Sequence, residues 1–210
     1  MKQIFFMMIS LVVFIVVSAQ TSALNQKEKD AIIYMREEEK LARDVYNFLF
    51  EKWEMNPFGN IRQSEQTHMD RIKILITTYK LEDPVAKNGD KPGVFSNSFL
   101  QNLYIQLTKS GSESVTAALK AGAKIEELDI ADLEERIAQT TNREIINTFN
   151  YLKQASENHL RAFTRRLKAE GVNYEPVILT KERFTEIIAS VNKGGNGNQR
   201  GKGSGACCNN

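Results

Sequence analysis

The sequence predicts an all-α fold in which four long amphipathic helices form a bundle with additional short helices. Three observations lead to this prediction. Apolar residues recur at three- and four-residue steps through four long stretches, which is the period of an amphipathic α-helix. Capping residues and Gly or Pro breaks separate these stretches. Nowhere do apolar and polar residues alternate with the period of two that is typical of a strand.

The first long helix is expected from Leu24 to Trp53, with Asn25 as a side-chain N-cap. A run of charged residues, three of them consecutive glutamates, lies in its middle. Projected on a helix, Glu38 lies near the centre of the apolar stripe, whereas Glu37 lies at its margin and Glu39 points away. Glu38 is therefore the carboxylate expected to face the core.

The second long helix is expected from about Phe58 to Lys80, after a turn that contains Pro57. Glu65 and His68 fall inside its apolar stripe. A crossing loop without regular structure is expected from Val85 to Ser96, because it contains two glycines and a proline. A short helix follows from Asn97 to Thr108. Four of its residues are expected to pack inward: Phe99, Leu100, Leu103 and Leu107.

The third long helix is expected from Ser112 to Gln139, and Glu126 lies near the centre of its stripe with Asp129 at the edge. Three other acidic residues of this helix are expected on its solvated face: Glu127, Glu134 and Glu135. The fourth long helix is expected from Arg143 to Glu170 and ends at a glycine. Its apolar stripe contains the polar residues Ser156 and His159, whereas the nearby Glu157 points away from the stripe. A last short helix is expected at 181–191.

Both ends of the chain look separable from a folded domain at 25–193. Residues 1–19 have the layout of a secretory signal peptide, with one lysine, an apolar run and then small residues. Cleavage after Ala19 fits this layout, and Ala23 is a second option. The apolar run is shorter than the roughly 20 residues of a membrane-spanning helix. We therefore expect export to the periplasm or the exterior, without stable membrane insertion after cleavage.

The C-terminal stretch at 194–210 is rich in Gly and Asn and is expected to be a disordered tail. It contains the only two cysteines, Cys207 and Cys208, and their role stays open. The formal net charge is +2, and removal of the signal peptide would lower it to +1, because Lys2 is the only charged residue in it. A nearly neutral chain without basic clusters argues against nucleic-acid binding. The sequence does not determine the oligomeric state, and a homo-oligomer is compatible with it.

Six polar side chains project toward the four stripes, and they include both histidines of the chain: Glu38, Glu65, His68, Glu126, Asp129 and His159. Four-helix bundles that hold two iron or manganese ions use one Glu from each of two helices and a Glu-x-x-His motif from each of the other two. Three of the long helices match this template. The fourth supplies a histidine, but Ser156 stands where the template has a carboxylate. A buried polar network without metal is the alternative interpretation.

The chain resembles the DUF2202 domain proteins, which are placed in the ferritin-like superfamily. The resemblance covers about 25–191 and rests on four motifs: Met35-Arg36-Glu37-Glu38-Glu39-Lys40-Leu41-Ala42-Arg43-Asp44-Val45-Tyr46, Asn60-Ile61-x-x-Ser64-Glu65-x-x-His68-Met69, Gly122-Ala123-x-Ile125-Glu126-Glu127-Leu128-Asp129-Ile130-x-Asp132-Leu133, and Ser156-x-Asn158-His159-Leu160-Arg161-x-Phe163. It implies a ferritin-like bundle and leaves the activity open. Because Ser156 stands where the template has a carboxylate, the sequence is as compatible with a single ion as with a full two-metal centre. An asymmetric pair of ions completed by Asp129 or water is equally compatible.

Three functions are consistent with these observations. The first is an exported, metal-dependent oxidoreductase that handles Fe(II), oxygen or peroxide. One or two Fe or Mn ions would be held by five ligands: Glu38, Glu65, His68, Glu126 and His159. Asp129 would be an additional ligand or a hydrogen-bonding partner of a ligand. Zn also suits these donors. The second is a metal-binding or structural module of the cell envelope without turnover. The third is a bundle whose buried polar residues only set the register of the helices.

Overall fold

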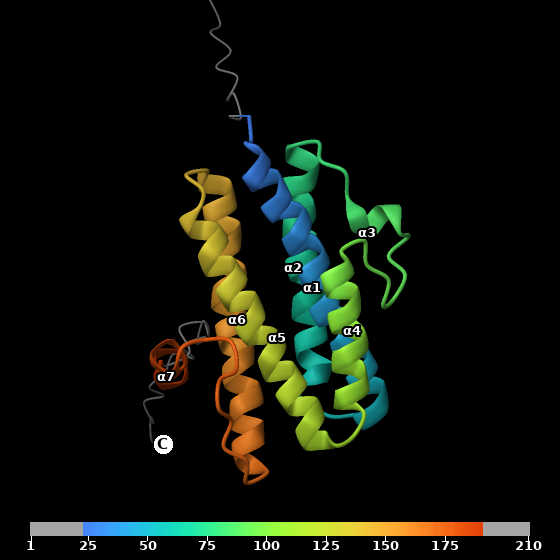
Figure 1. Cartoon of the computed structure of the whole chain (residues 1–210), viewed down its shortest axis with the longest axis vertical. Coiled ribbons are helices and arrows are strands. Elements are labelled where there is room, and N and C mark those ends of the chain that lie inside the picture. The colour runs from blue at the N-terminus through green and yellow to red at the C-terminus, as the bar shows by residue number, and fades with distance from the viewer. Residues whose placement is uncertain (1–22, 191–210) are drawn as a thin grey trace, which may run out of the picture.

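The computed structural model describes residues 23–190, so the predicted signal peptide and C-terminal tail lie outside the described residues. The described part is all-helical, as predicted, and no strand occurs between residues 23 and 190. Figure 1 shows the long helices lying side by side along the long axis. The helices are α1 (Gln26–Trp53), α2 (Phe58–Thr78), α3 (Pro84–Lys87), α4 (Ser98–Gly111), α5 (Val115–Ala138), α6 (Arg143–Ala169) and α7 (Lys181–Ala189).

The predicted helix ends agree closely with local capping. Asn25 caps α1, and its side chain accepts a hydrogen bond from the Glu28 amide while the Glu28 carboxylate accepts one from the Asn25 amide. Asn142 caps α6 in the same sense, by accepting from the amides of Glu144 and Ile145. Gly171 follows α6 with a φ of +76°, the left-handed conformation that glycine adopts without strain.

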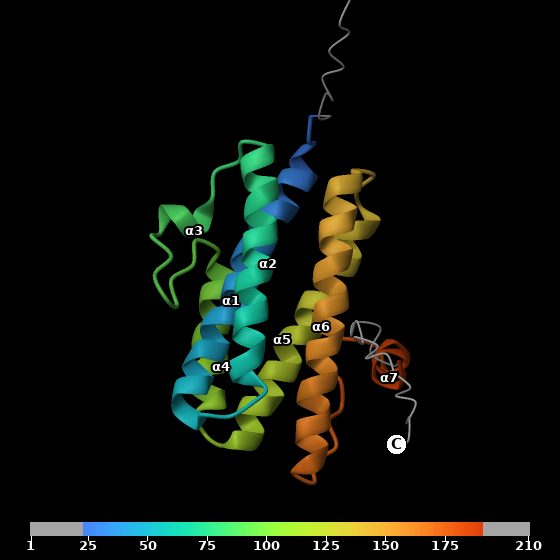
Figure 2. The ribbon, with the colours of Figure 1, turned by 180° about the vertical axis from the view of Figure 1, so that it is seen from behind.

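The long helices are arranged as two closely packed pairs, α1 with α2 and α5 with α6. Figure 2 shows the same pairs from behind. Helix α1 also contacts α5, and α2 contacts α6, so the two pairs face each other. Helix α4 packs against both α1 and α5. The first pair is joined by a short turn, whereas α2 and α5 are separated by the long connection that contains α3 and α4.

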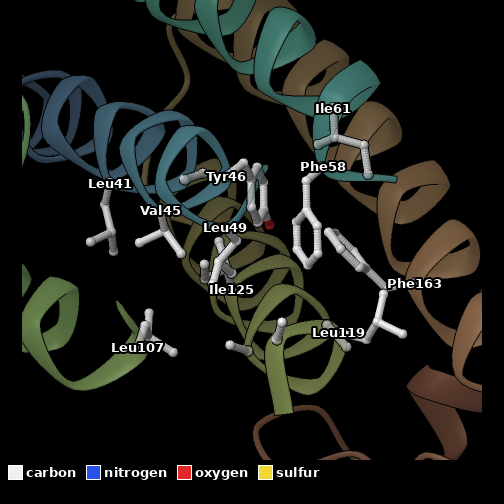
Figure 3. Close-up of a cluster of buried hydrophobic side chains, with 14 of the residues drawn as sticks. Leu41, Val45, Tyr46, Leu49, Phe58, Ile61, Leu107, Leu119, Ile125 and Phe163 are labelled. Carbon is white, nitrogen blue, oxygen red and sulfur yellow. The ribbon is translucent and has the colours of Figure 1, made fainter. Parts of the chain in front are cut away.

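The core consists of two apolar clusters with a polar layer between them. One cluster includes Tyr46, Phe58 and Phe163, which Figure 3 shows side by side. The other includes Ile32 and Phe149. Along α1, α2 and α6 the clusters occupy opposite ends of the helix, and the buried Glu and His residues come between them. The order of the clusters along each chain segment shows that α2 runs antiparallel to both α1 and α6.

Helix α1 is enclosed on all sides in its middle. Every residue from Met35 to Tyr46 is buried, because α2, α3, α4 and α5 all pack against this helix. The Lys40 side chain is fully buried and forms an ion pair with Asp44, while its Nζ also donates to the Lys91 carbonyl over 2.8 Å. Arg43 binds Asp44 and Asp90. This ionic network holds the segment between α2 and α4 against α1.

Two expectations for this connection were wrong. The segment expected to lack regular structure begins with the short helix α3, because Asp83 caps it and Pro84 occupies its first turn, where proline starts a helix. In α4, Leu100, Leu103 and Leu107 are buried as predicted, but Phe99 is 56% exposed. Phe99 lies one residue before this buried stripe and so roughly 100° around the helix from Leu100.

Glu127 was expected on the solvated face of α5, and this was wrong as well. Its carboxylate is fully buried and accepts hydrogen bonds from the backbone amides of Val177, Ile178 and Leu179 and from the Tyr174 hydroxyl. It therefore holds the segment that leads from α6 to α7 against α5. Glu135 is exposed, as expected. No helix within residues 23–190 has the length and apolar character needed to cross a membrane.

We predict that Gly122→Ala destabilises the fold. An added Cβ would lie 2.3 Å from Cε1 of Phe163 in the closely packed core. Overpacking of this kind costs about 1–3 kcal/mol. This exceeds the gain of up to about 1 kcal/mol that alanine brings to a helix interior. Urea unfolding should show a lower free energy of unfolding.

Phe163→Leu is the matched partner for this test, because a shorter side chain relieves the clash. Combined with Gly122→Ala, it should cost less than the sum of the two single changes. A neutral or stabilising Gly122→Ala, or strictly additive costs, would contradict the packing described for Gly122.

Candidate metal centre

The polar layer between the two apolar clusters includes five metal-compatible side chains, three carboxylates and both histidines. Helix α2 contributes Glu65 and His68, which lie three residues apart on one face. Helix α1 contributes Glu39, α5 contributes Glu126 and α6 contributes His159. All five side chains are buried, with His159 the most accessible at 9%. The sequence prediction that Glu65, His68, Glu126 and His159 face inward agrees with this arrangement.

These side chains form two groups that share Glu65. In the first group, one ligand atom from each of Glu39, Glu65 and His68 lies within 4.8 Å of the other two. Nδ1 of His68 is 2.8 Å from Oε2 of Glu65 and 3.1 Å from Oε2 of Glu39. In the second group, Nδ1 of His159 is 2.9 Å from Oε1 of Glu65 and 3.4 Å from Oε2 of Glu126. Glu65 thus presents one oxygen to each histidine.

Ser64 lies next to the Nε2 atoms of both imidazoles, whereas the carboxylates lie next to the Nδ1 atoms. Its Oγ is 3.3 Å from Nε2 of His68 and 3.1 Å from Nε2 of His159. The two rings stack with centroids 5.6 Å apart. A serine oxygen can accept two hydrogen bonds, so it can hold the Nε2–H of both rings. In that tautomer the Nδ1 lone pairs are directed at the carboxylates, which is where a cation would bind.

Several buried ligand atoms in this layer lack hydrogen-bond partners: Glu39 Oε1, Glu65 Oε1, Asp129 Oδ1 and His159 Nδ1. Oε1 of Glu65 and Nδ1 of His159 are close together without the alignment of a hydrogen bond. Buried polar atoms are almost always satisfied, and an unpaired buried charge is costly. A metal ion bound by carboxylate oxygens and imidazole nitrogens would satisfy these atoms. The donor set therefore fits a divalent cation.

The electrostatics reflect this crowding of charge. Burial alone would raise the pKa of Glu65, but His68 and His159 lower it below its usual range. Burial would lower the pKa of His159, yet Glu126 and Glu65 raise it to about 10. Burial raises the pKa of Glu39 well above its usual range. In the metal-free protein, the two imidazoles thus carry protons that a bound cation would replace at Nδ1.

Asp129 lies beside Ser156, the residue that replaces the carboxylate expected on α6. Oγ of Ser156 donates a hydrogen bond to Oδ2 of Asp129, and Oδ1 of Asp129 has no partner. Burial raises the pKa of Asp129 to about 7, although the hydrogen bond from Ser156 lowers it. A carboxylate from α5 therefore reaches the place next to Ser156, and α6 holds it there.

Tyr46 connects the polar layer to the aromatic cluster. Its ring packs 5.4 Å from Phe163, and Figure 3 shows its hydroxyl oxygen at the end of the ring, away from the α1 ribbon. The hydroxyl donates to Oε1 of Glu126 over 2.5 Å. Tyr46 therefore has both a packing contact in the aromatic cluster and a direct hydrogen bond to the site.

Glu39, rather than Glu38, is the glutamate of α1 that belongs to a metal-compatible group. Glu38 is buried, but it belongs to neither metal-compatible group. Glu39, which was expected to point away, is 1% exposed and faces His68. The projection failed because α1 is enclosed on all sides, so one apolar stripe does not define its inward face. The approach of α2, which carries His68, decides which glutamate joins the site.

Comparisons with known proteins show a similar family and a similar solved structure. Residues 28–191 match a family described as an uncharacterized protein domain, DUF2202. The uncharacterized protein MJ0754 of Methanocaldococcus jannaschii is 48% identical over 172 residues, which cover 82% of this chain and 92% of that protein. The crystal structure of the hypothetical protein MJ0754 has a TM-score of 0.80 and 47% identity, covering 84% of this chain and 99% of that chain.

We predict that the metal-free protein loses stability as pH rises from 6 to 9. The pKa of His159 is raised, so its contribution is complete below about 6.5, its usual pKa, and is lost as the pH approaches 10. The raised pKa of Asp129 acts in the same direction up to about pH 7. Thermal unfolding of chelator-treated protein should show a falling Tm, by roughly 2–4 °C for each kcal/mol lost.

His159→Gln is the control for this prediction, because it removes the titrating imidazole. This variant should show a shallower decline between pH 6 and 9 than the wild type. A wild-type Tm that stays constant or rises over this range would contradict the electrostatics described for the site.

Proposed function

The chain belongs to the DUF2202 family, and we propose that it is a metal-binding protein whose site lies in a ferritin-like four-helix bundle. One observation carries the proposal. The two oxygens of the buried Glu65 carboxylate face the Nδ1 atoms of two different histidines, and each pair is joined by a further carboxylate. Residues that only set helix register need hydrogen-bond partners, and several atoms of this group have none.

The chain topology supports the ferritin-like part of the proposal. Two antiparallel pairs face each other, and one long connection joins them. One long crossover is the connectivity of ferritin-like bundles. The metal-compatible residues come from the middles of α1, α2, α5 and α6, as they do in bundles that hold metals between facing helices.

We assign one metal position to Glu39, Glu65 and His68, and a second to Glu65, Glu126 and His159. Asp129 would complete the pair from α5, in place of the carboxylate that Ser156 does not supply. Oxygen and imidazole donors suit iron and manganese, and zinc binds the same donors. We propose iron or manganese, as one or two ions, in place of the sequence-based ligand set that included Glu38.

Iron or manganese bound there supplies one-electron redox chemistry toward oxygen, peroxide or further Fe(II). The residues of the chain prepare the site for this chemistry. Ser64 keeps both imidazoles in one orientation through their Nε2 atoms. Tyr46 holds a proton on the oxygen that is hydrogen-bonded to Glu126. The two apolar clusters exclude water from the layer that contains Glu65.

A second candidate function is metal binding without turnover, as a structural or metal-handling module of the cell envelope. Ser156 favours it, because the template carboxylate on α6 is absent and Asp129 must serve in its place. A single firmly held ion would then be sufficient. Air or peroxide should change the absorption spectrum of the Fe(II)-loaded protein if the redox function is correct, and should leave it unchanged if this second function is correct.

We further propose that the protein is exported through the signal peptide predicted at residues 1–19. The lysine, apolar run and small residues of that segment support export, and the family match begins only at residue 28. Its proposed partners are metal ions, with homo-oligomers compatible with the chain. The nearly neutral net charge supports a function without nucleic acid, and the short apolar run supports signal cleavage without stable membrane insertion.

The proposal predicts that full-length protein purified without chelator and loaded with Fe(II) or Mn(II) contains about one ion or more per chain. Glu65→Ala should lower this content to less than about one fifth, because the variant removes the ligand shared by both positions. Glu39→Gln should also lower the content. Elemental analysis of the desalted protein measures each value.

Glu38→Gln is the matched control, since it makes the same change one residue away on α1, outside both groups. It should retain the wild-type metal content. A wild type that takes up no metal, or a Glu65→Ala variant with the wild-type content, would refute the proposed function. A loss of metal in Glu38→Gln but not in Glu39→Gln would restore the ligand set expected from the sequence.

A further inference from the structure

Glu38 is a buried carboxylate without an explained role. It is 1% exposed, and neither of its oxygens has a hydrogen-bond partner. The neighbouring glutamates on α1 are both accounted for, since Glu37 accepts from the amides of Ser96 and Asn97 and Glu39 faces the histidine of α2. An unpaired carboxylate in an apolar interior is costly. Its two unpaired oxygens are therefore suited to binding a cation.

Helix α5 presents a ladder of acidic residues beside Glu38. Glu126, Asp129 and Asp132 follow one another at three-residue steps. Each step rises about 4.5 Å along the helix and turns about 60° around it. Glu126 lies in the central site, Asp129 is 5% exposed, and the Asp132 side chain is 20% exposed. The ladder thus leads from the metal-compatible layer to the protein surface.

Glu38 faces this ladder from α1. Two contacts between α1 and α5 set its level: the Tyr46 hydroxyl binds Glu126, and Tyr34, one turn before Glu38, packs against Arg136, one turn after Asp132. Glu38 lies between these contacts on α1, as Asp129 and Asp132 do on α5. Oδ1 of Asp129 also has no hydrogen-bond partner. Two of the three carboxylates in this neighbourhood therefore have oxygen atoms free to bind a passing cation.

The outer end of the ladder opens into a surface groove of about 510 Å³ between α1 and α5. Four carboxylates and two cations line the groove: Asp30, Glu37, Asp132, Glu135, Lys27 and Arg136. The groove is therefore negative overall and attracts cations. Arg136 lines the groove, with its Nη1 3.2 Å from Asp132 and its guanidinium carbon 4.2 Å from the centre of the Tyr34 ring. This guanidinium neutralises Asp132 until another cation competes for it.

We propose that Asp132, Glu38 and Asp129 form an uptake route along which divalent cations pass from the α1/α5 groove to the central site. Glu38 binds the cation transiently, between the groove and Asp129. Arg136 acts as a movable counterion at the mouth of the route. This inference rests on the proposed metal-binding function and adds the path by which a buried site is loaded.

The test is the rate of Co(II) uptake by the full-length protein, followed by its absorption in a stopped-flow instrument. Glu38→Gln and Asp132→Asn should each slow uptake by about tenfold or more, because each removes a carboxylate that would bind the passing cation. Both should reach the wild-type final Co(II) content. Arg136→Gln should speed uptake, because it removes the competing cation. Circular dichroism checks that each variant is folded.

Release of Co(II) to an excess of chelator sharpens this test. A residue on the route lowers the barrier in both directions, so its loss slows release by the same factor as uptake and leaves the affinity unchanged. Loss of a permanent ligand would instead speed release. Glu135→Gln is the matched control, because it removes the same charge from the groove off the path. It should change either rate less than about twofold.

The outcomes separate this proposal from the proposed function. Wild-type protein that takes up no Co(II) overturns both. If the wild type takes up Co(II) and both Glu38→Gln and Asp132→Asn take it up at the same rate, the route alone is overturned. Glu38 is then a buried carboxylate without a part in uptake. A lower final content or faster release in Glu38→Gln makes it a permanent ligand and also overturns the route. If Glu135→Gln slows uptake as much as the two route variants do, the slowing comes from the overall charge of the groove, and the route is overturned as well.

Discussion

The structure depends on the placement of one carboxylate between two imidazoles. Glu65 lies in the middle of α2, and its oxygens are 2.8 Å from Nδ1 of His68 and 2.9 Å from Nδ1 of His159. Both imidazoles lower the pKa of Glu65, and the carboxylates in turn raise the pKa of each imidazole. Glu65 is paired with His68 within α2, whereas the charge of His159 on α6 depends on the carboxylates that α2 and α5 supply. This pairing favours the packing of α6 against α2.

The apolar clusters on either side give this polar layer its chemical character. The ring cluster around Tyr46 closes one end, and the aliphatic residues around Ile72 close the other. Water is kept from the charged groups, so their interactions are stronger than they would be at the surface. The same exclusion of water makes each unpaired atom costly, which is why the unpaired oxygens of Glu38 and Asp129 are informative. Their positions suggest where a cation resides and how it arrives.

Much of the fold, and part of the site, could be predicted from the sequence. Glu65, His68 and His159 fall into apolar stripes of helical period, so their inward direction is a local property. Glu39 was missed because α1 is buried on every side and only the approach of α2 selects the inward glutamate. Glu127 was missed because its partners are amides about 50 residues further along the chain, in a segment without periodicity. Contacts of that kind depend on tertiary packing.

The most direct test of this account is anomalous diffraction from crystals of the protein loaded with Fe(II) or Mn(II). A metal bound at the proposed site should give an anomalous peak about 2 Å from a Glu65 oxygen and from Nδ1 of His68 or His159. A second peak at the other histidine would identify a two-metal centre. Crystals that show no anomalous density in this layer, with Glu65 hydrogen-bonded directly to both imidazoles, would contradict the central claim and leave a buried ionic network in its place.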